Sequence, residues 1–237
     1  MWLLLGFSSD VSYYDGLANE NISCIMLRVS VQIQVYTGGP VMCNGYLVKG
    51  PEGYVAVDAP AGFAAWVSAR MPKDAKLTDL LLTHQHFDHV QDVAALQRCT
   101  GCRVHAAAQY SQELTLEALA GGAGWIPAVE PYKVDDVLPG DVCRTWAGLN
   151  WQVHSIPGHS PDGVAYGLPE EMLVFVGDIL FEGSIGRTDF PGGSQSRLVR
   201  GIREKLMKLA PETTVYSGHG PNTSVQEEEL NNPWLTC

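Results

Sequence analysis

The sequence predicts an α+β protein in which helices cover the outside of a β-sandwich. Two observations predict this class. Strand signals come first and are then mixed with helix signals, and this order occurs twice along the chain. No Ser- or Pro-rich linker and no internal repeat interrupts the pattern. Residues 27–237 are therefore expected to form a single domain.

The first half of the chain contains most of the strand signals. Apolar and polar residues alternate across 29–35, which is typical of a half-buried strand. Short apolar runs on both sides of Lys49–Gly53 indicate a hairpin, and the run Leu77–Thr83 indicates a buried strand. A helix is predicted to begin at the acidic residue Asp88. The predicted elements of this half are strands at 29–35, 44–48, 54–57, 77–83 and 103–106 and helices at 63–70, 88–97 and 109–119.

The second half repeats the pattern with fewer strands before its last helices. Strands are predicted at 151–156, 164–166, 172–176 and 214–216. An amphipathic helix is predicted at 197–209 and a short acidic helix at 224–230. Residues 1–26 show no clear period and are interpreted as an N-terminal extension. Met26, just before the first strand signal, is a candidate translation start.

Composition limits the classes of function. The 237 residues are 46% hydrophobic, which argues against intrinsic disorder, and the formal net charge of −11 disfavours nucleic acid and anionic membranes as partners. The apolar run Met1–Phe7 is too short to span a bilayer and lacks the flanks of a secretory signal, so a cytoplasmic protein is expected. The six cysteines are scattered, and Cys99–Cys102 is interpreted as a pair of thiols under a turn. Nothing in the sequence predicts an oligomeric state.

The segment Thr83–His89 carries the strongest chemical signal. It places His84, His86, Asp88 and His89 directly after an apolar strand. Side chains at i and i+2 of an extended chain project the same way, and the last two residues open a helix, so all four can converge. Burying this many ionisable groups is costly unless a cation neutralises them, and imidazole with carboxylate suits zinc or iron-group metals. The segment therefore predicts a metal site.

Three further candidate ligands occupy similar places along the chain. His159, Asp178 and His219 each follow a predicted strand and lie beside a glycine, which allows close approach of the backbone. If these strand ends share one edge of the sheets, the side chains meet there. His105 and His154 lie inside predicted strands instead and are interpreted as satisfied core or surface histidines.

The number of candidate ligands predicts two ions. A catalytic zinc takes about three protein ligands plus water and a structural zinc about four, so seven candidates exceed the need of one tetrahedral ion. Two metals about 3.5–4 Å apart lower the pKa of a bridging water and polarise a substrate oxygen. No Ser-His-Asp set, P-loop or G-x-G-x-x-G motif indicates another chemistry.

These residues resemble those of the metallo-β-lactamase-fold hydrolases, and especially the short bacterial members of the glyoxalase II (hydroxyacylglutathione hydrolase) branch. The resemblance covers residues 31–223. Beyond the His84–His89 motif it rests on the segments Pro157–Pro161, Phe175–Asp178, Phe181–Phe190 and Ser217–Pro221. It implies a four-layer αββα sandwich with metal ions at one edge.

The resemblance also implies a role for each ligand. The first ion would be held by His84, His86 and His159, the second by Asp88, His89 and His219, with Asp178 bridging them. A metal-bridging hydroxide, oriented by Asp88, would attack the carbonyl of a thioester such as S-D-lactoylglutathione. Zinc is the first expectation for the metal, with iron or manganese as alternatives.

Two residues outside the ligand set also receive roles from the resemblance. Arg187 would bind the glutathione part of the substrate through a carboxylate, although an ion pair with Asp189 is an equally good interpretation. Asp58 would orient a ligand histidine through a hydrogen bond. The segment Gly186–Phe190 also resembles persulfide dioxygenases, which use one iron bound by two histidines and one aspartate. An oxidoreductase of this kind is therefore the alternative function.

Overall fold

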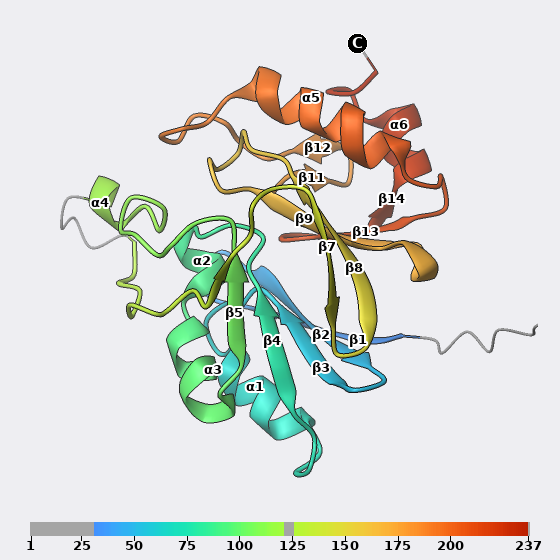
Figure 1. Cartoon of the computed structure of the whole chain (residues 1–237). Coiled ribbons are helices and arrows are strands. Elements are labelled where there is room, and N and C mark those ends of the chain that lie inside the picture. The colour runs from blue at the N-terminus through green and yellow to red at the C-terminus, as the bar shows by residue number, and fades with distance from the viewer. Residues whose placement is uncertain (1–30, 121–125, 237) are drawn as a thin grey trace, which may run out of the picture.

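The computed structural model describes residues 31–120 and 126–236, which form two β-sheets packed face to face with helices on both outer faces (Figure 1). The first sheet has the strand order β1 (Gln32–Gly38), β2 (Cys43–Gly50), β3 (Gly53–Val57), β4 (Leu77–Leu81), β5 (Arg103–Ala106) and β6 (Asp136–Val137). Its first three strands are antiparallel, and β3 to β6 run parallel. The extension predicted at 1–26, with Met26, lies outside the described residues.

The second sheet has the strand order β14 (Thr223–Ser224), β13 (Thr214–Ser217), β10 (Leu173–Gly177), β9 (Val164–Leu168), β8 (Leu149–Ser155) and β7 (Val142–Trp146). Strands β10 and β13 are parallel, while β9 is antiparallel to both of its neighbours, β8 and β10. It follows that β8, β10 and β13 point in the same direction. A two-stranded ribbon, β11 (Leu180–Phe181) and β12 (Ser184–Ile185), follows β10.

Three apolar layers hold this arrangement together. The helices are α1 (Phe63–Arg70), α2 (Phe87–Val90), α3 (Val93–Thr100), α4 (Glu117–Ala120), α5 (Gln195–Lys205) and α6 (Val225–Asn231). Phe63 belongs to the first layer, between the first sheet and α1 to α3, and Trp151 belongs to the second, between the sheets. Ile202 belongs to the third layer, beneath α5 and α6. Both sheets bury both faces, so the predicted αββα sandwich is confirmed.

The helix predicted at 109–119 is largely wrong. This segment forms turns, and only Glu117–Ala120 is helical. The Ser111 hydroxyl accepts a hydrogen bond from the Leu114 N–H, and the Thr115 hydroxyl donates to the Glu117 carboxylate at 2.6 Å. Leu116 adopts a positive φ of 66°. Local side-chain hydrogen bonds and a left-handed residue therefore replace the helical ladder here.

The helix predicted at 88–97 is divided into α2 and α3 at Gln91 and Asp92. The Asp92 carboxylate accepts the backbone N–H of Ala64 at 2.9 Å, in the first turn of α1. Its own N–H donates to the carbonyl of Ala59 at 2.9 Å. Asp92 therefore satisfies a free backbone N–H group at the start of α1, and the predicted helix 88–97 is interrupted there.

Five short strands were not predicted, among them β7, β11 and β14. Four of the five have only two residues, and β7 shows a weak alternation, Val142-Cys143-Arg144-Thr145-Trp146. Pairing with longer neighbours makes them strands, because a short edge strand has little signal of its own.

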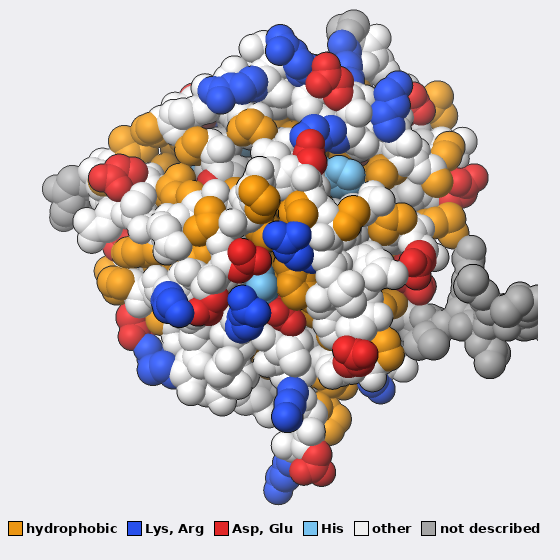
Figure 2. All heavy atoms as spheres, in the orientation of Figure 1, with side chains coloured by type: hydrophobic (Ala, Val, Ile, Leu, Met, Phe, Trp, Pro, Cys, Tyr) orange, Lys and Arg blue, Asp and Glu red, His pale blue; other side chains and the backbone are white. Residues whose placement is uncertain are grey.

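On the face shown in Figure 2, hydrophobic side chains form a band between upper and lower areas where acidic and basic side chains are interspersed. Within residues 31–120 and 126–236, no helix combines the length and apolar character needed to cross a membrane.

Candidate metal centre

Four predicted ligands follow the end of β4 in the first sheet. His84 and His86 lie in the loop after this strand, and Asp88 and His89 lie on the short helix α2. All four side chains are buried, between 0 and 8% exposed. Such burial of ionisable groups is costly unless they find partners of opposite charge or a cation. The structure therefore brings together the groups that the motif was expected to bring together.

The other three predicted ligands follow strands of the second sheet. His159 comes after β8, Asp178 directly after β10, and His219 shortly after β13. Because these three strands point the same way, their ends meet at one edge, next to the loop after β4. Candidate ligand atoms of all seven residues fall into overlapping groups in which every atom lies within 4.8 Å of the others.

The first of these groups consists of His84, His86 and His159. The Nδ1 atom of His86 and the Nε2 atom of His159 are 2.9 Å apart. The ring centroids of His84 lie 4.5 Å from His86 and 4.9 Å from His159, in edge-on arrangements. Three imidazoles that point into one small volume are the donor set of a catalytic zinc site.

A second group contains Asp88, His89 and His219, together with the thiol of Cys43. The Asp88 Oδ2 atom lies 3.1 Å from Nε2 of His219 and 3.8 Å from Nε2 of His89. Cys43 was not singled out from the sequence, because it lies 41 residues before the nearest predicted ligand, His84. A lone cysteine in a strand carries no spacing signal.

Asp178 lies between the two groups. Its Oδ1 atom is 3.2 Å from Nε2 of His89, in the second group. Its Oδ2 atom is 3.5 Å from Nε2 of His159, in the first group, and 3.6 Å from Nε2 of His219. One carboxylate therefore faces both sets of imidazoles, which is the geometry that a bridging ligand requires.

Unpartnered atoms show that the residues fit a metal. Among the described residues, the Nε2 atoms of His84 and His89 and the Oδ1 atom of Asp178 are buried and make no hydrogen bond of suitable geometry, although the last two atoms lie 3.2 Å apart. Leaving a buried polar atom unsatisfied costs about 1–3 kcal/mol, and most such atoms in native proteins have partners. Bound divalent cations would satisfy all three atoms. The donor set of imidazoles and carboxylates suits zinc, iron or manganese.

The protonation states also suit a metal. Burial and the neighbouring imidazole of His159 lower the pKa of His86 to about 3. Burial, with the rings of His89 and His86 beside it, lowers the pKa of His84 well below its ordinary value. Burial alone would raise the pKa of Asp178, but the imidazoles of His89, His219 and His159 outweigh it and lower this pKa. Neutral imidazoles and an ionised carboxylate are the forms that bind metals.

Hydrogen bonds from outside the cluster orient the ligands. His89 Nδ1 lies 2.8 Å from Asp58 Oδ2, and the same carboxylate accepts the N–H and the hydroxyl of Thr83 at 2.8 and 2.7 Å. His159 Nδ1 lies 2.7 Å from the carbonyl of Arg187. Asp58 is one of few non-glycine residues with a positive φ, 56°, in the described part of the chain. Such strain is held in place by these three contacts and points to a functional constraint.

A glycine at the end of β13 makes the close approach of the two sheets possible. A Cβ atom on Gly218 would collide with the Asp178 carboxylate and with the ring of His89. The Gly218 carbonyl also accepts the N–H of Asn44 at 2.7 Å, which joins the second sheet to the start of β2. No side chain larger than hydrogen fits between these ligands.

The cluster opens into a cleft of about 500 Å³. His86, Asp88, His159, Asp178 and His219 form its polar floor. Its walls are mainly apolar and consist of Pro40, Val41, Phe87, Leu116, Phe181 and Phe190. A concave apolar cleft with a few convergent polar groups is the usual form of a small-molecule site.

Arg187 lines this cleft, where its guanidinium faces Asp189 and Phe190. Its Nε and Nη2 atoms donate to the two carboxylate oxygens of Asp189 at 2.7 and 2.6 Å, and its guanidinium lies 4.2 Å from the ring centroid of Phe190. The ion pair considered from the sequence is therefore present. The side chain is 60% exposed and still lines the cleft.

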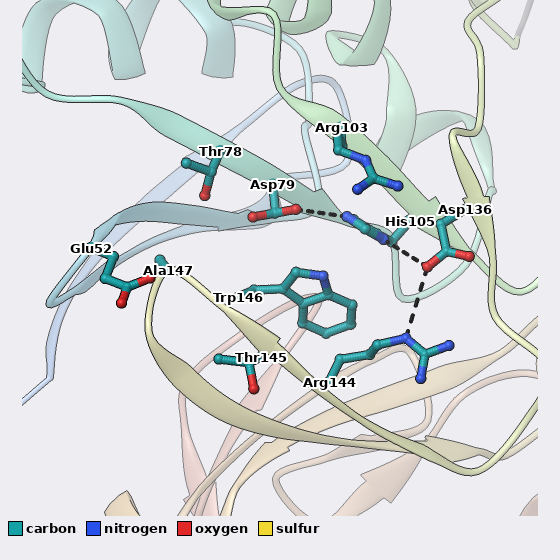
Figure 3. A pocket seen from close by; sticks show the side chains of 10 residues that line it. All are labelled: Glu52, Thr78, Asp79, Arg103, His105, Asp136, Arg144, Thr145, Trp146 and Ala147. Atoms are coloured by element: carbon teal, nitrogen blue, oxygen red, sulfur yellow. Dashed lines mark hydrogen bonds and ion pairs between the residues drawn. The ribbon is translucent and has the colours of Figure 1, made fainter.

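A separate polar cluster lies near the start of β4 and β5, at the end of these strands away from the metal ligands (Figure 3). His105 Nε2 lies 2.8 Å from Asp79 Oδ1, Nδ1 lies 3.4 Å from Asp136 Oδ2, and the ring packs on Trp146. Its burial and its Asp79 partner agree with the interpretation of a core histidine. Neither His105 nor His154 belongs to a candidate ligand group among the described residues.

The fold and the cluster agree with comparisons to known sequences. A family model described as the metallo-beta-lactamase superfamily matches residues 38–219. The chain is 34% identical over 201 residues to the probable metallo-hydrolase YqgX of Bacillus subtilis, covering 83% of this chain and 94% of that protein. It is 32% identical over 197 residues to the hydroxyacylglutathione hydrolase GloC of Haemophilus influenzae, covering 81% of this chain and 92% of that protein.

Solved structures of similar proteins agree with the family match. The BLEG-1 B3 metallo-beta-lactamase superposes with a TM-score of 0.78 at 31% identity, covering 87% of this chain and 100% of the other. TTHA1623 in a di-iron-bound form gives 0.74 at 34% identity over 85% and 100% of the two chains. ETHE1 from Myxococcus xanthus gives 0.68 at 27% identity over 85% and 83%. With its αββα sandwich and clustered histidines and aspartates, this chain belongs to the metallo-β-lactamase superfamily of metal-dependent hydrolases.

Proposed function

We propose that this protein is a binuclear metallohydrolase that cleaves a thioester of the S-D-lactoylglutathione class. The observation that carries the proposal is the position of Asp178, whose two carboxylate oxygens face two separate sets of imidazoles. The 32% identity to a hydroxyacylglutathione hydrolase supports the choice of a thioester as substrate.

Seven side chains would hold the two ions. The first position would be formed by His84, His86 and His159, the second by Asp88, His89 and His219, with Asp178 shared. Bound divalent cations would supply a water of lowered pKa and a Lewis acid for the carbonyl oxygen. Zinc is the first expectation for both positions, with iron or manganese as alternatives.

The cleft favours hydrolysis by water over a covalent route. The lining residues that lie in the described part of the chain include no serine, threonine or cysteine. Water adds to the acyl carbon, the carbon–sulfur bond breaks, and the products are a carboxylic acid and a thiol. Asp88 lines the cleft next to His219, so we assign it to holding the attacking water through a hydrogen bond. Phe87 and Phe190 limit the access of other water molecules to the floor.

Arg187 is proposed to bind the thiol part of the substrate. A carboxylate on the substrate would compete with Asp189 for the fork of the guanidinium. Because this pair is largely exposed, exchanging one carboxylate for another costs little. We therefore expect Arg187 to affect binding of a carboxylate-bearing thiol and not the chemical step.

Metal analysis of the purified protein, followed by a substrate panel, tests the function. The proposal expects two metal ions per chain and hydrolysis of S-D-lactoylglutathione or another thioester. The panel also contains a lactone and a β-lactam, because relatives on this fold include a protein titled a B3 metallo-beta-lactamase. Metal-loaded protein that turns over no thioester would contradict the proposal.

A mononuclear iron persulfide dioxygenase is the second candidate. One ligand group, His84, His89 and Asp178, has two histidines and one aspartate, and the structure of ETHE1 superposes at 27% identity. One iron per chain, together with oxygen uptake that depends on glutathione persulfide, would favour this candidate. Two metals per chain without such uptake would favour the hydrolase.

A further inference from the structure

A buried thiol lies beside the second ligand group. Cys43 is the first residue of β2, is 0% exposed, and has its Sγ within 4.8 Å of candidate ligand atoms of Asp88, His89 and His219. The thiol makes one long hydrogen bond, 3.6 Å to the carbonyl of Asn44, and it also interacts with the imidazole of His89. Unlike Cys102, it does not belong to the apolar layers of the sandwich. Hydrophobic packing therefore does not explain its position.

We propose that the Cys43 sulfur is a further protein ligand of the second metal position, in addition to Asp88, His89, His219 and the shared Asp178. The inference rests on the metal-binding part of the proposed function and is independent of the substrate. It makes the two positions chemically different, with a sulfur ligand at one of them.

The distances allow this coordination. Metal–ligand bonds of about 2.0–2.3 Å place neighbouring donor atoms roughly 3 Å apart around a five- or six-coordinate ion and roughly 3.6 Å apart around a tetrahedral one. Asp88 Oδ2 is already 3.1 Å from His219 Nε2 and 3.8 Å from His89 Nε2. The His89 Nε2 atom lacks a hydrogen-bond partner. The sulfur, within 4.8 Å of these atoms, needs a shift of about two ångströms at most to reach coordination distance.

The backbone holds Cys43 and His219 next to each other. The N–H of Asn44 donates to the carbonyl of Gly218 at 2.7 Å, and the Asn44 amide donates to the carbonyls of Ser217 and Gly220 at 3.1 and 3.0 Å. These bonds fasten the start of β2 to the loop that carries His219. The thiol and the imidazole therefore approach the site from one rigid unit, as a preorganised metal site requires.

Binding a metal would change the protonation of this thiol. The form of cysteine that binds a metal is the thiolate and not the thiol. On binding, the S–H bond breaks, a metal–sulfur bond forms, and the proton leaves to solvent. No oxidation or reduction takes place.

A sulfur ligand has consequences for the whole centre. With Cys43 the second position has five candidate protein ligands, the shared Asp178 included, whereas the first position has four. Thiolate also favours zinc, cobalt or ferrous iron over manganese. We therefore expect the second position to bind the first equivalent of metal and the first position to bind the next.

Cobalt substitution tests the bond directly, because a thiolate ligand gives cobalt(II) a charge-transfer band in the near ultraviolet that imidazole and carboxylate do not give. The parent protein carries serine at Cys24, Cys99, Cys143 and Cys237, so that only the two buried thiols remain. We expect the band to grow to saturation with the first equivalent of cobalt. Cys43→Ser should abolish the band while the visible d–d bands persist, and Cys43→Ala tests the same bond without a hydroxyl.

The matched control is Cys102→Ser, which makes the same change at a buried thiol outside the cluster and should keep the band. We also expect Cys43→Ser to weaken binding of the first zinc equivalent by about 10–100-fold and manganese much less. A parent protein with two bound cobalt ions and no charge-transfer band would overturn the inference, as would a band that survives in Cys43→Ser. Absence of thioesterase activity would leave the band unaffected, so failure of the proposed function is a separate result.

Discussion

At the scale of single residues, Asp178 is the centre of the electrostatics of the cluster. Histidines from both groups lie within 3.6 Å of its carboxylate oxygens and lower its pKa, although burial acts in the other direction. A permanent negative charge at this point offsets the repulsion of two cations. The second carboxylate, Asp88, faces only one group. The two acids are therefore expected to have different roles.

Replacing Asp178 by alanine should remove metal and activity together. Without the shared carboxylate, neither position has its full ligand set, so we expect fewer than one metal per chain and thioester turnover near background. Elemental analysis and a turnover assay on the same preparation measure both effects. Asp136→Ala, in the polar cluster around His105, is the control and should keep its metals. Activity retained in Asp178→Ala would exclude its bridging role.

At the scale of elements, the site is built from strand ends. The strands β8, β10 and β13 each deliver one ligand, and β4 delivers the motif that continues into α2. The close approach of these ends depends on the loop after β13, where Gly218 lies against Asp178 and His89. The geometry of the candidate metal centre therefore depends on where these strands end more than on the length of any one strand.

Gly218→Ala should weaken metal binding without touching a ligand. The added methyl group collides with the Asp178 carboxylate and the His89 ring, so both must move. Overpacking of this kind costs about 1–3 kcal/mol of stability, and we expect metal affinity to fall at least tenfold. Metal titration and urea unfolding report the two effects. Gly167→Ala on β9, where the methyl group meets only ordinary contacts, should change neither.

Asp141, just before β7, ties that edge strand to α5. Its carboxylate accepts hydrogen bonds from Lys205 Nζ at 2.7 and 2.8 Å and from the N–H of Ser155 at 2.8 Å. Partial burial alone would raise the pKa of Asp141, but these hydrogen bonds lower it. Because the pKa of this carboxylate is lowered in the folded state, its ionised form stabilises the protein at a pH above the unfolded pKa of about 3.9. This stabilisation is lost as the pH falls through the folded pKa.

We therefore expect Asp141→Asn to destabilise the protein at neutral pH by about 0.5–1 kcal/mol, the range of a partly exposed ion pair. The difference from the wild type should shrink as the pH falls from about 5 towards 3. Urea unfolding at several pH values measures it. A difference that stays constant with pH, or grows in acid, would show that the ion pair is not its cause.

At the scale of the whole molecule, the candidate centre connects the two sheets. The ligands after β4 belong to the first sheet, and His159, Asp178 and His219 belong to the second. The apolar layer around Trp151 joins the sheets, and bound metal would add a polar link at the edge. Metal binding is thus expected to stabilise the sandwich as a unit.

Removing the metal with a chelator should lower the thermal unfolding temperature. Metal at a thousand times its Kd stabilises the folded state by about 4 kcal/mol, which for a chain of this size is a shift on the order of 10 °C. Differential scanning calorimetry before chelation, after it, and after zinc is restored measures the shift. The same treatment of Asp178→Ala should have little effect. An unchanged unfolding temperature in the native protein would mean that the cations do not link the sheets.

Local patterns in the sequence predicted a sandwich with helices outside and the seven candidate ligands, and the resemblance to the metallo-β-lactamase fold implied the αββα layers. A histidine motif after an apolar strand, and a polar residue beside a glycine after three others, are signals within a few residues. The prediction of a helix at 109–119 was wrong because side-chain hydrogen bonds of Ser111 and Thr115 and the left-handed conformation of Leu116 replace helical backbone hydrogen bonds. The shortest strands were not predicted because they are defined by pairing with neighbouring strands and not by their own composition.

Only the tertiary structure placed the Cys43 thiol beside Asp88, His89 and His219, and only it showed that Asp178 faces both sets of imidazoles. The physical reason is that such contacts join residues far apart in the chain. The packing of two sheets and the direction of β8, β10 and β13 set their distances, and no short-range pattern encodes these.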